Sequence, residues 1–248
     1  MPKRGLSQEA LKAIACVTML LDHIGATIVL DSFYRATGVE KAQLAEAYNI
    51  LRTIGRLAFP IYCFLLVEGA FYTKNPKRYG LRLLIGALLS EIPFDLAFYG
   101  SINTNEQSVM ITLLLGFGML MAMNKVPKLW LKLLLVLPVA LMAKKLGTDY
   151  GAKGILVIAA FAFTRNLPRK HLLQALLLWF IFSPNHLMML NWLDGFRITV
   201  LERAVVAVVP IALYNGQKAT KSKALQWGFY LFYPVHLLIL WMVLGFIR

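Results

Sequence analysis

The sequence predicts an all-α fold: a polytopic transmembrane helical bundle of about nine spans, some of them kinked. Of its 248 residues, 59% are hydrophobic and only 15% are charged, whereas soluble globular domains contain about 25% charged residues. Apolar runs recur along the whole length and are separated by short basic or Gly/Pro-rich turns, with no long linker. Such runs are expected to be helices, because backbone polar groups within a bilayer must bond to one another. Residues 1–248 are therefore predicted to form a single integral membrane domain.

Each predicted span is an apolar run bounded by turns. The first run, from Leu11 to Leu30, contains twenty residues, which is enough to cross a hydrocarbon core of about 30 Å. The runs at 129–144 and 152–164 are short, so one of these two could re-enter the membrane rather than cross it. In chain order, the predicted spans lie near residues 10–30, 50–72, 81–99, 108–124, 129–144, 152–164, 171–183, 198–214 and 227–247.

The cations are concentrated in alternate turns, although the net charge of +14 is high. The cation-rich turns contain Lys3/Arg4, Lys74/Lys77/Arg78, Lys125/Lys128, Arg165/Arg169/Lys170 and Lys218/Lys221/Lys223. The intervening turns are poorer in cations, and residues 100–107 have none. This positive-inside pattern predicts a cytoplasmic N-terminus and an external C-terminus, with an exception at the turn 144–153, where three lysines fall on the predicted outside. The cations thus set topology and contact lipid head groups, so nucleic acid is not an expected partner.

The first span contains an ionisable pair, Asp22-His23, well inside its apolar run. Placing a charged side chain at this depth in the membrane costs roughly 2.5–3.5 kcal/mol of free energy, so such a residue is first interpreted as part of a functional site. Lys12 lies eleven positions before His23, and eleven helical steps return to nearly the same face after a rise of about 16 Å. One stripe of the helix therefore has a cation at the membrane edge and an imidazole in the interior. This arrangement suits a long anionic cofactor whose reactive end reaches the middle of the membrane.

The third span contains a pair of carboxylates, Glu91 and Asp95, which lie four residues apart and hence on one helix face. Pro93 between them frees a backbone carbonyl and is expected to kink the helix. Carboxylates at this depth need protons, cations or donors to neutralise them, and Arg56 and His23 are suitable partners. A purely structural ion-pair network is the alternative interpretation.

Other polar residues within or beside the apolar runs are Arg56, Glu68, His236 and the pair Asp149-Tyr150. Each has a structural alternative: Arg56 could extend to the interface, Glu68 could lie at the interface, and His236 could be a core histidine bonded to a neighbouring helix. A metal site built from His23, His236, Glu91 and Asp95 would have suitable ligand types. No HxxxH or HExxH spacing occurs, so no metal is expected.

The remaining histidines and the cysteines have simpler interpretations. His171 and His186 fall in turns and are interpreted as surface residues. Cys16 and Cys63 lie in predicted spans without a CxxC motif, so they are interpreted as small packing residues rather than metal ligands or a redox pair.

A lone histidine beside an acid in a membrane cavity suits general base catalysis, in which the imidazole takes a proton from a hydroxyl or amine that attacks a thioester. No GxSxG motif and no phosphate-binding Gly-rich loop occurs, so direct transfer is favoured over a covalent serine mechanism. Neighbouring helical residues point about 100° apart. Asp22 is therefore not assumed to orient His23, and Glu91 or Asp95 from another helix could do so instead.

Six segments taken together resemble the TraX family in order and spacing: LKAIACVTMLLDHIGA, RTIGRLAFPIYCFLLVEGA, RLLIGALLSEIPFDLAF, VMITLLLGF, DYGAKGIL and FYPVHLLIL. That family is associated with N-terminal acetylation of conjugative pilin subunits. Lys12-x10-His23 is also similar to the Arg/Lys-x10-His signature of membrane acyltransferases that O-acetylate surface sugars. Lysine offers a point charge where that signature more often has the bidentate fork of arginine.

The resemblance implies an acyl-CoA donor in the cytoplasm and an acceptor on the outer side. It implies that His23 is the catalytic base and that Lys12 holds the donor. The cavity lining that it implies comprises Asp22, Arg56, Glu91, Asp95, Asp149, Tyr150 and His236. The catalytic group is thus taken as His23, Asp22, Glu91 and Asp95, and the substrate-binding group as Arg56, Asp149, Tyr150 and His236. The cations Lys74, Lys77, Arg78 and Arg82 are expected within reach of the 3′-phosphate of coenzyme A, on the basic cytoplasmic side.

The sequence therefore predicts a multi-pass protein of the bacterial cytoplasmic membrane that transfers an acyl group, an acetyl group by the resemblance, from acetyl-CoA. The expected partners are membrane lipids, acyl-CoA and an extracytoplasmic acceptor, for which pilin, wall polymer, glycolipid and peptide all stay open. Two alternatives are a proton-coupled transporter, which would also use intramembrane acids and histidines, and a non-enzymatic assembly factor for a surface appendage, whose polar residues only join helices.

Overall fold

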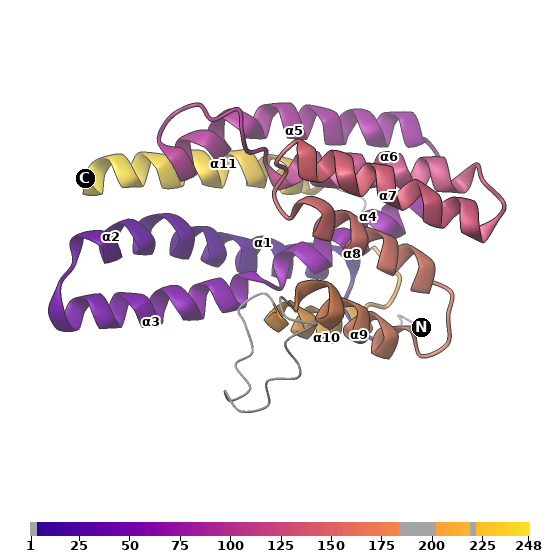
Figure 1. Ribbon diagram of the computed structural model, residues 1–248, viewed down its shortest axis with the longest axis horizontal. Coiled ribbons are helices and arrows are strands. Elements are labelled where there is room, and N and C mark those ends of the chain that lie inside the picture. The colour runs from indigo at the N-terminus through magenta and orange to yellow at the C-terminus, as the bar shows by residue number, and fades with distance from the viewer. Residues whose placement is uncertain (1–3, 184–201, 219–221) are drawn as a thin grey trace.

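The computed structural model describes residues 4–183, 202–218 and 222–248, which form helices and no strand (Figure 1). Three helical stretches are long and apolar enough to cross a membrane: Gln8–Arg35, Gly38–Tyr72 and Ala224–Ile247. Shorter apolar helices accompany them at Val109–Asn124, Gly151–Thr164, Lys170–Phe182 and Arg203–Ala212. The prediction of an all-helical membrane protein is thus confirmed. His186, Lys3, Lys221 and the start of the predicted span 198–214 lie outside the described residues.

The first predicted span is longer than expected. Helix α1 (Gln8–Ile24) begins at Ser7, whose hydroxyl accepts a hydrogen bond from the Ala10 amide (3.1 Å), and continues through a π-helical turn, η1 (Gly25–Val29), into α2 (Leu30–Arg35). These 28 residues rise about 42 Å, which exceeds the hydrocarbon thickness. The π-helical turn directly follows His23, and such turns are frequent at functional sites.

The segment expected to link the first two spans is also helical. Helix α3 (Gly38–Gly55) precedes α4 (Ala58–Tyr72) and packs along α1 in the opposite direction (Figure 1). Its first part is rich in Ala, Glu, Gln and Leu, which favour helix even where a segment is polar. The two helices approach closely at Gly55, where a Cβ would overlap the side chain of Asp22. This glycine lets the end of α3 bring its arginines against α1.

The second half of the bundle surrounds α4. Helix α5 (Pro76–Tyr99) begins at Asn75, whose Oδ1 accepts a hydrogen bond from the Arg78 amide (2.9 Å), and ends at Gly100 in a left-handed conformation (φ 72°). Helix α11 (Lys223–Ile247) lies along α5 (Figure 1). The remaining helices are α6 (Val109–Asn124), α7 (Leu129–Lys145), α8 (Gly151–Thr164), α9 (Lys170–Phe182), the 3₁₀ turn η3 (Glu202–Ala207) and α10 (Val208–Ala212).

The interior and the outer surface are both apolar. Large side chains of α4, α6 and α8, among them Ile61, Met119 and Ile158, are fully buried. Outward-facing leucines of α7, such as Leu133, Leu137 and Leu141, are more than half exposed. An apolar exterior over several helices is a liability in water and is expected where lipid covers the protein. The polar side chains described next are thus enclosed between helices.

Candidate functional site

A cavity of about 630 Å³ lies between α1, α3, α4, α5, α6 and α11 and the turn that precedes α8. At the level of the α1 N-terminus it is lined by Gln8, Glu9, Lys12, Arg82, Lys218, Phe229 and Tyr230, in the middle by Asp22, His23, Arg52 and Arg56, and farther on by Tyr99, Glu106, Asp149 and Tyr150. Its size falls within the usual range of small-molecule sites, about 300–1,000 Å³. The structure therefore brings Lys12 and His23 to one continuous space, as the spacing along α1 predicted.

The entrance end of the cavity combines cations with aromatic rings. Lys12 Nζ lies 5.3 Å from the centre of the Phe229 ring. The Arg82 guanidinium lies 5.5 Å from the centre of the Tyr79 ring and 5.9 Å from that of Tyr230, to whose hydroxyl it donates a hydrogen bond (3.4 Å). Cation–π contacts of this kind hold the guanidinium in place while its charge stays available.

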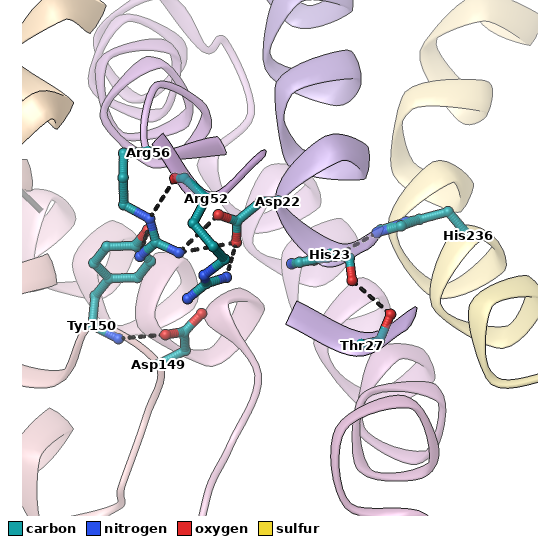
Figure 2. Close-up of polar contacts among 8 residues, drawn as sticks. All are labelled: Asp22, His23, Thr27, Arg52, Arg56, Asp149, Tyr150 and His236. Atoms are coloured by element: carbon teal, nitrogen blue, oxygen red, sulfur yellow. Dashed lines mark hydrogen bonds and ion pairs between the residues drawn. The ribbon is translucent and has the colours of Figure 1, made fainter. Parts of the chain in front are cut away.

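Asp22 is paired with two arginines of the facing helix pair α3–α4 (Figure 2). Arg56 Nη2 donates to Asp22 Oδ1 (2.8 Å) and Oδ2 (3.0 Å), and Arg52 Nη1 also donates to Oδ2. Arg56 further donates to the Tyr150 hydroxyl (3.2 Å) and the Arg52 carbonyl (3.3 Å). Because Asp22 and Arg56 are 8% and 7% exposed, this is a buried ion cluster in the cavity wall, and Arg56 does not extend to an interface.

His23 points to a different partner, His236 of α11 (Figure 2). His23 Nδ1 and His236 Nε2 are 2.7 Å apart, and the two rings are nearly parallel, at 8°. Phe98 packs edge-on against the His23 ring, with centroids 5.3 Å apart. His236 itself stands behind His23 and borders a small apolar groove instead of the main cavity. The structure thus separates Asp22 from the ring of His23, and His236 is placed to orient His23 rather than to touch a substrate.

Glu91 and Asp95 are not brought to the cavity wall. Glu91 accepts hydrogen bonds from the Ser108 hydroxyl (2.5 Å) and amide (3.2 Å), which lie at the start of α6. Asp95 accepts one from the Asn103 amide (3.0 Å). The two carboxylates thus anchor the loop 100–108 between α5 and α6, since backbone amides are effective donors to buried carboxylates. In this structure they neither orient His23 nor pair with Arg56.

The predicted cations of the α4–α5 turn divide into two groups. Arg82 lines the cavity, whereas Lys74, Lys77 and Arg78 are exposed on the surface outside it. Glu68 also lines the cavity and pairs with Arg165 (2.7 Å), which in turn packs on the rings of Phe71 and Tyr72. Cys16 and Cys63 are buried free thiols, as their interpretation as packing residues requires.

Asp149 and Tyr150 lie in the turn between α7 and α8. Tyr150 adopts a left-handed backbone conformation (φ 62°) and stacks on Phe59, with centroids 3.8 Å apart and ring planes at 7°. Asp149 accepts a hydrogen bond from the Tyr150 amide (2.9 Å), and the exposed part of its side chain faces the cavity. Although Asp149 keeps an exposed surface, the protein atoms around the turn reduce the hydration of its carboxyl and raise its pKa to about 6, while Arg56 acts in the opposite direction.

Replacing Asp149 by Asn is expected to stabilise the protein above about pH 6. The folded-state pKa is raised above the ordinary value of 3.8, so the unfolded carboxyl releases its proton at lower pH than the folded one. The wild type therefore loses stability as the pH rises from about 4 to about 6. The Asn variant keeps the side-chain carbonyl and loses the charge. Melting temperatures of both proteins in detergent should coincide near pH 4 and diverge by pH 7. A constant difference across that range would contradict the raised pKa.

Two lining cations were not singled out from the sequence, Arg52 and Lys218. Arg52 lies four residues before Arg56, and this helical spacing was an available signal for a shared face. In the sequence, Lys218 served only as one of the cations that predict the orientation in the membrane. Its position near Lys12 depends on how the chain returns to α1 before α11 begins.

Comparison with known proteins identifies a family to which the chain is similar over nearly its whole length. The sequence profile of the family described as TraX protein matches residues 7–244. One similar relative is the "Probable fimbrial assembly protein FimC, serogroup H1" of Dichelobacter nodosus, which is 27% identical over 245 residues, covering 93% of this chain and 92% of the relative. Another is the "Uncharacterized protein RP591" of Rickettsia prowazekii (strain Madrid E), which is 28% identical over 109 residues, covering 44% of this chain and 34% of the relative.

No solved structure matches this chain. The family assignment rests on sequence. Because the profile match extends over nearly the whole length, from residue 7 to residue 244, the protein belongs to the TraX family.

Proposed function

We propose that this protein is an integral membrane acyltransferase that moves an acetyl group from cytoplasmic acetyl-CoA to an amine or hydroxyl acceptor on the outer side. The observation that supports this most strongly is the continuity of one cavity from the cation-rich entrance at Lys12 to the imidazole of His23. Several ionisable side chains line this space, and ionisable residues inside a membrane protein are costly to maintain, which favours a function.

The entrance fits the chemistry of coenzyme A. Lys12, Arg82 and Lys218 would bind phosphate groups, and the rings of Phe229 and Tyr230 offer faces on which adenine can stack. The pantetheine arm would then follow the stripe of α1 for the roughly 16 Å between Lys12 and His23. The exposed cations Lys74, Lys77 and Arg78 would raise the local concentration of the anionic donor without holding it.

The proposed reaction is a direct transfer. The acceptor nitrogen or oxygen attacks the thioester carbonyl carbon while His23 Nε2 takes the proton of the attacking group. The tetrahedral intermediate then collapses: the carbon–sulfur bond breaks, and His23 returns the proton to the sulfur of coenzyme A. Arg52 and Arg56 lie within electrostatic range of His23 and would stabilise the developing oxyanion.

The proposed orientation follows from the donor. Acetyl-CoA is a cytoplasmic molecule, so the end of the cavity at the N-terminus of α1 would face the cytoplasm, and the end beyond Asp149 and Tyr150 would receive the acceptor. On this proposal the N-terminus would lie inside, the C-terminus outside and the protein in the cytoplasmic membrane of a bacterium, in agreement with the distribution of cations. The association of the family with pilin acetylation makes a pilin-like polypeptide one acceptor to test.

Everted membrane vesicles that contain the protein, supplied with acetyl-CoA labelled in its acetyl group, test this proposal. We expect acid-insoluble label on vesicle material with the wild-type protein and none without it. Lys12→Ala should raise KM for acetyl-CoA roughly 10- to 100-fold, since a charge-assisted phosphate contact contributes about 1.5–3 kcal/mol. Lys125→Ala, at the end of α6 and outside the cavity lining, should leave KM unchanged. Absence of label together with no effect of acetyl-CoA on the melting temperature would contradict the proposal.

A second candidate is a non-enzymatic assembly factor for a surface appendage, and the name of the Dichelobacter relative supports it. In that case the buried ion cluster and the histidine pair would only join helices. This candidate predicts that fimbrial assembly is lost when the gene is deleted and that it is restored by an Arg82→Ala, Lys12→Ala variant. The acyltransferase proposal predicts that the same variant fails to restore acetyl transfer.

A further inference from the structure

We infer that His236 is a positioning residue that sets the tautomer of His23, so that the unprotonated Nε2 of His23 faces the cavity. This inference rests on the proposed function in one respect, because a general base needs an available lone pair at the reacting end. The hydrogen-bond geometry that carries it is independent of what the protein acetylates.

The directions of two hydrogen bonds determine the tautomer. His236 Nδ1 lies 2.7 Å from the carbonyl oxygen of Phe232. A carbonyl only accepts, so His236 Nδ1 carries the proton and the Nε2 of a neutral His236 is an acceptor. His23 Nδ1 lies 2.7 Å from that Nε2 and must therefore donate to it. In a neutral His23, the other nitrogen, Nε2, is then left without a proton.

The surroundings of the pair favour the neutral form of both rings. His23 and His236 are 8% and 5% exposed, and burial disfavours an unpaired charge. The cations that act on His23 are Arg52 and Arg56, while the acid beside it, Asp22, is bonded to those two arginines and not to the ring. The other groups against the rings are Phe98, Tyr233 and Phe232.

Apart from His23, the polar partners of His236 are backbone groups of its own helix, at Phe232 and Tyr233. The groove that it borders, about 240 Å³ in volume, is otherwise lined by Leu20, Phe232, Val235, Ile239 and Leu240. Its two ring nitrogens are both engaged, one with the Phe232 carbonyl and one with His23. His236 lies four residues after Phe232 on α11, so the Phe232 carbonyl fixes the proton on His236 Nδ1. Through His236 Nε2 it also fixes the proton on His23 Nδ1, although His23 and His236 are 213 residues apart in sequence.

The ¹⁵N resonances of the histidine rings in lipid bilayers test the inference without any assay of transfer. At a pH well above ordinary imidazole ionisation, we expect an unprotonated Nε2 and a protonated Nδ1 for His23, assigned by comparison with His23→Gln. His236→Leu should populate the opposite tautomer of His23. A protonated Nε2 in the wild type, or a tautomer unaffected by His236→Leu, would overturn the inference.

Kinetics of labelled acetyl transfer distinguish a positioning role from simple packing. His236→Glu keeps an acceptor towards His23 Nδ1 and should retain transfer, whereas His236→Leu fills the site without one. We expect His236→Leu to lose kcat by roughly 10- to 10⁴-fold, the upper figure being the cost of the wrong tautomer in serine proteases, with KM for acetyl-CoA unchanged.

If His236 only packed against its neighbours, His236→Leu would be more active than His236→Glu, because a buried carboxylate is tolerated less well than leucine. Full activity of His236→Leu would therefore overturn the inference. If the wild-type protein transfers no acetyl group, the proposed function fails, and the ring resonances still decide whether His236 sets the tautomer.

Discussion

His23→Gln is expected to lose acetyl transfer by roughly 10²–10⁴-fold, the usual contribution of a general base. Glutamine can keep a hydrogen bond to His236, but its amide does not take a proton from an attacking amine or hydroxyl. The loss should lie in kcat, because Lys12, Arg82 and Lys218, which would bind the phosphates, are untouched. Labelled acetyl-CoA supplied to everted vesicles measures the rate.

His171→Gln is a matched control for this substitution. His171 lies on α9 and bonds to Gln174 (3.1 Å), away from the cavity, so its variant should transfer at the wild-type rate. Equal melting temperatures of the wild type and His23→Gln would show that the fold is intact. Wild-type transfer by a folded His23→Gln protein would exclude His23 as the base.

Asp22→Leu is expected to destabilise the protein by about 3–5 kcal/mol, the cost of leaving the partner of a buried ion pair without its counter-charge. Arg56 loses two charge-assisted bonds, at 2.8 and 3.0 Å, and Arg52 loses its contact as well. The close approach of α3 to α1 at Gly55 would still hold both guanidinium groups in place. They would then lack a counter-charge. Thermal or denaturant unfolding in detergent measures the effect.

Asp31→Asn is the matched control, because Asp31 pairs with Arg35 and Arg248, whose side chains are 47% and 58% exposed. Exposed pairs of this kind contribute about 0–1 kcal/mol. Adding Arg56→Met to Asp22→Leu should recover part of the lost stability, since the pair is then replaced by apolar groups. An Asp22→Leu protein as stable as Asp31→Asn would show that the ion cluster does not stabilise the folded protein.

Features that depend on local periodicity could be predicted from the sequence. Apolar runs predicted the helices α6, α8 and α11 to within a few residues, because burial or lipid contact requires an unbroken apolar stretch. The run predicted at 50–72 instead contains the end of α3 and the whole of α4. Helical spacing also predicted that Lys12 and His23 share a face, and both line the cavity. The polar helix α3 was missed, because hydropathy detects only apolar helices, whereas α3 is favoured by the helix propensity of its residues.

Partner choice among the polar residues could not be predicted in this way. Glu91 and Asp95 share a helix face, as expected, yet that face meets the loop 100–108, where the amide of Ser108 donates to Glu91 and the amide of Asn103 donates to one oxygen of Asp95. His236 lies behind His23 because α11 returns between α1 and α5, a contact that spans 213 residues. Hydrogen bonds act over about 3 Å, so they depend on how distant helices are placed rather than on neighbours in the chain.

The sequence by itself thus determined the class of protein, its apolar helices and the stripe of α1 that runs from Lys12 to His23, because these follow from composition and from the 3.6-residue period. Only the tertiary structure decided that Asp22 pairs with Arg52 and Arg56, and that His23 pairs with His236. The physical reason is that two adjacent residues on a helix point about 100° apart, so each of them meets a different neighbouring helix.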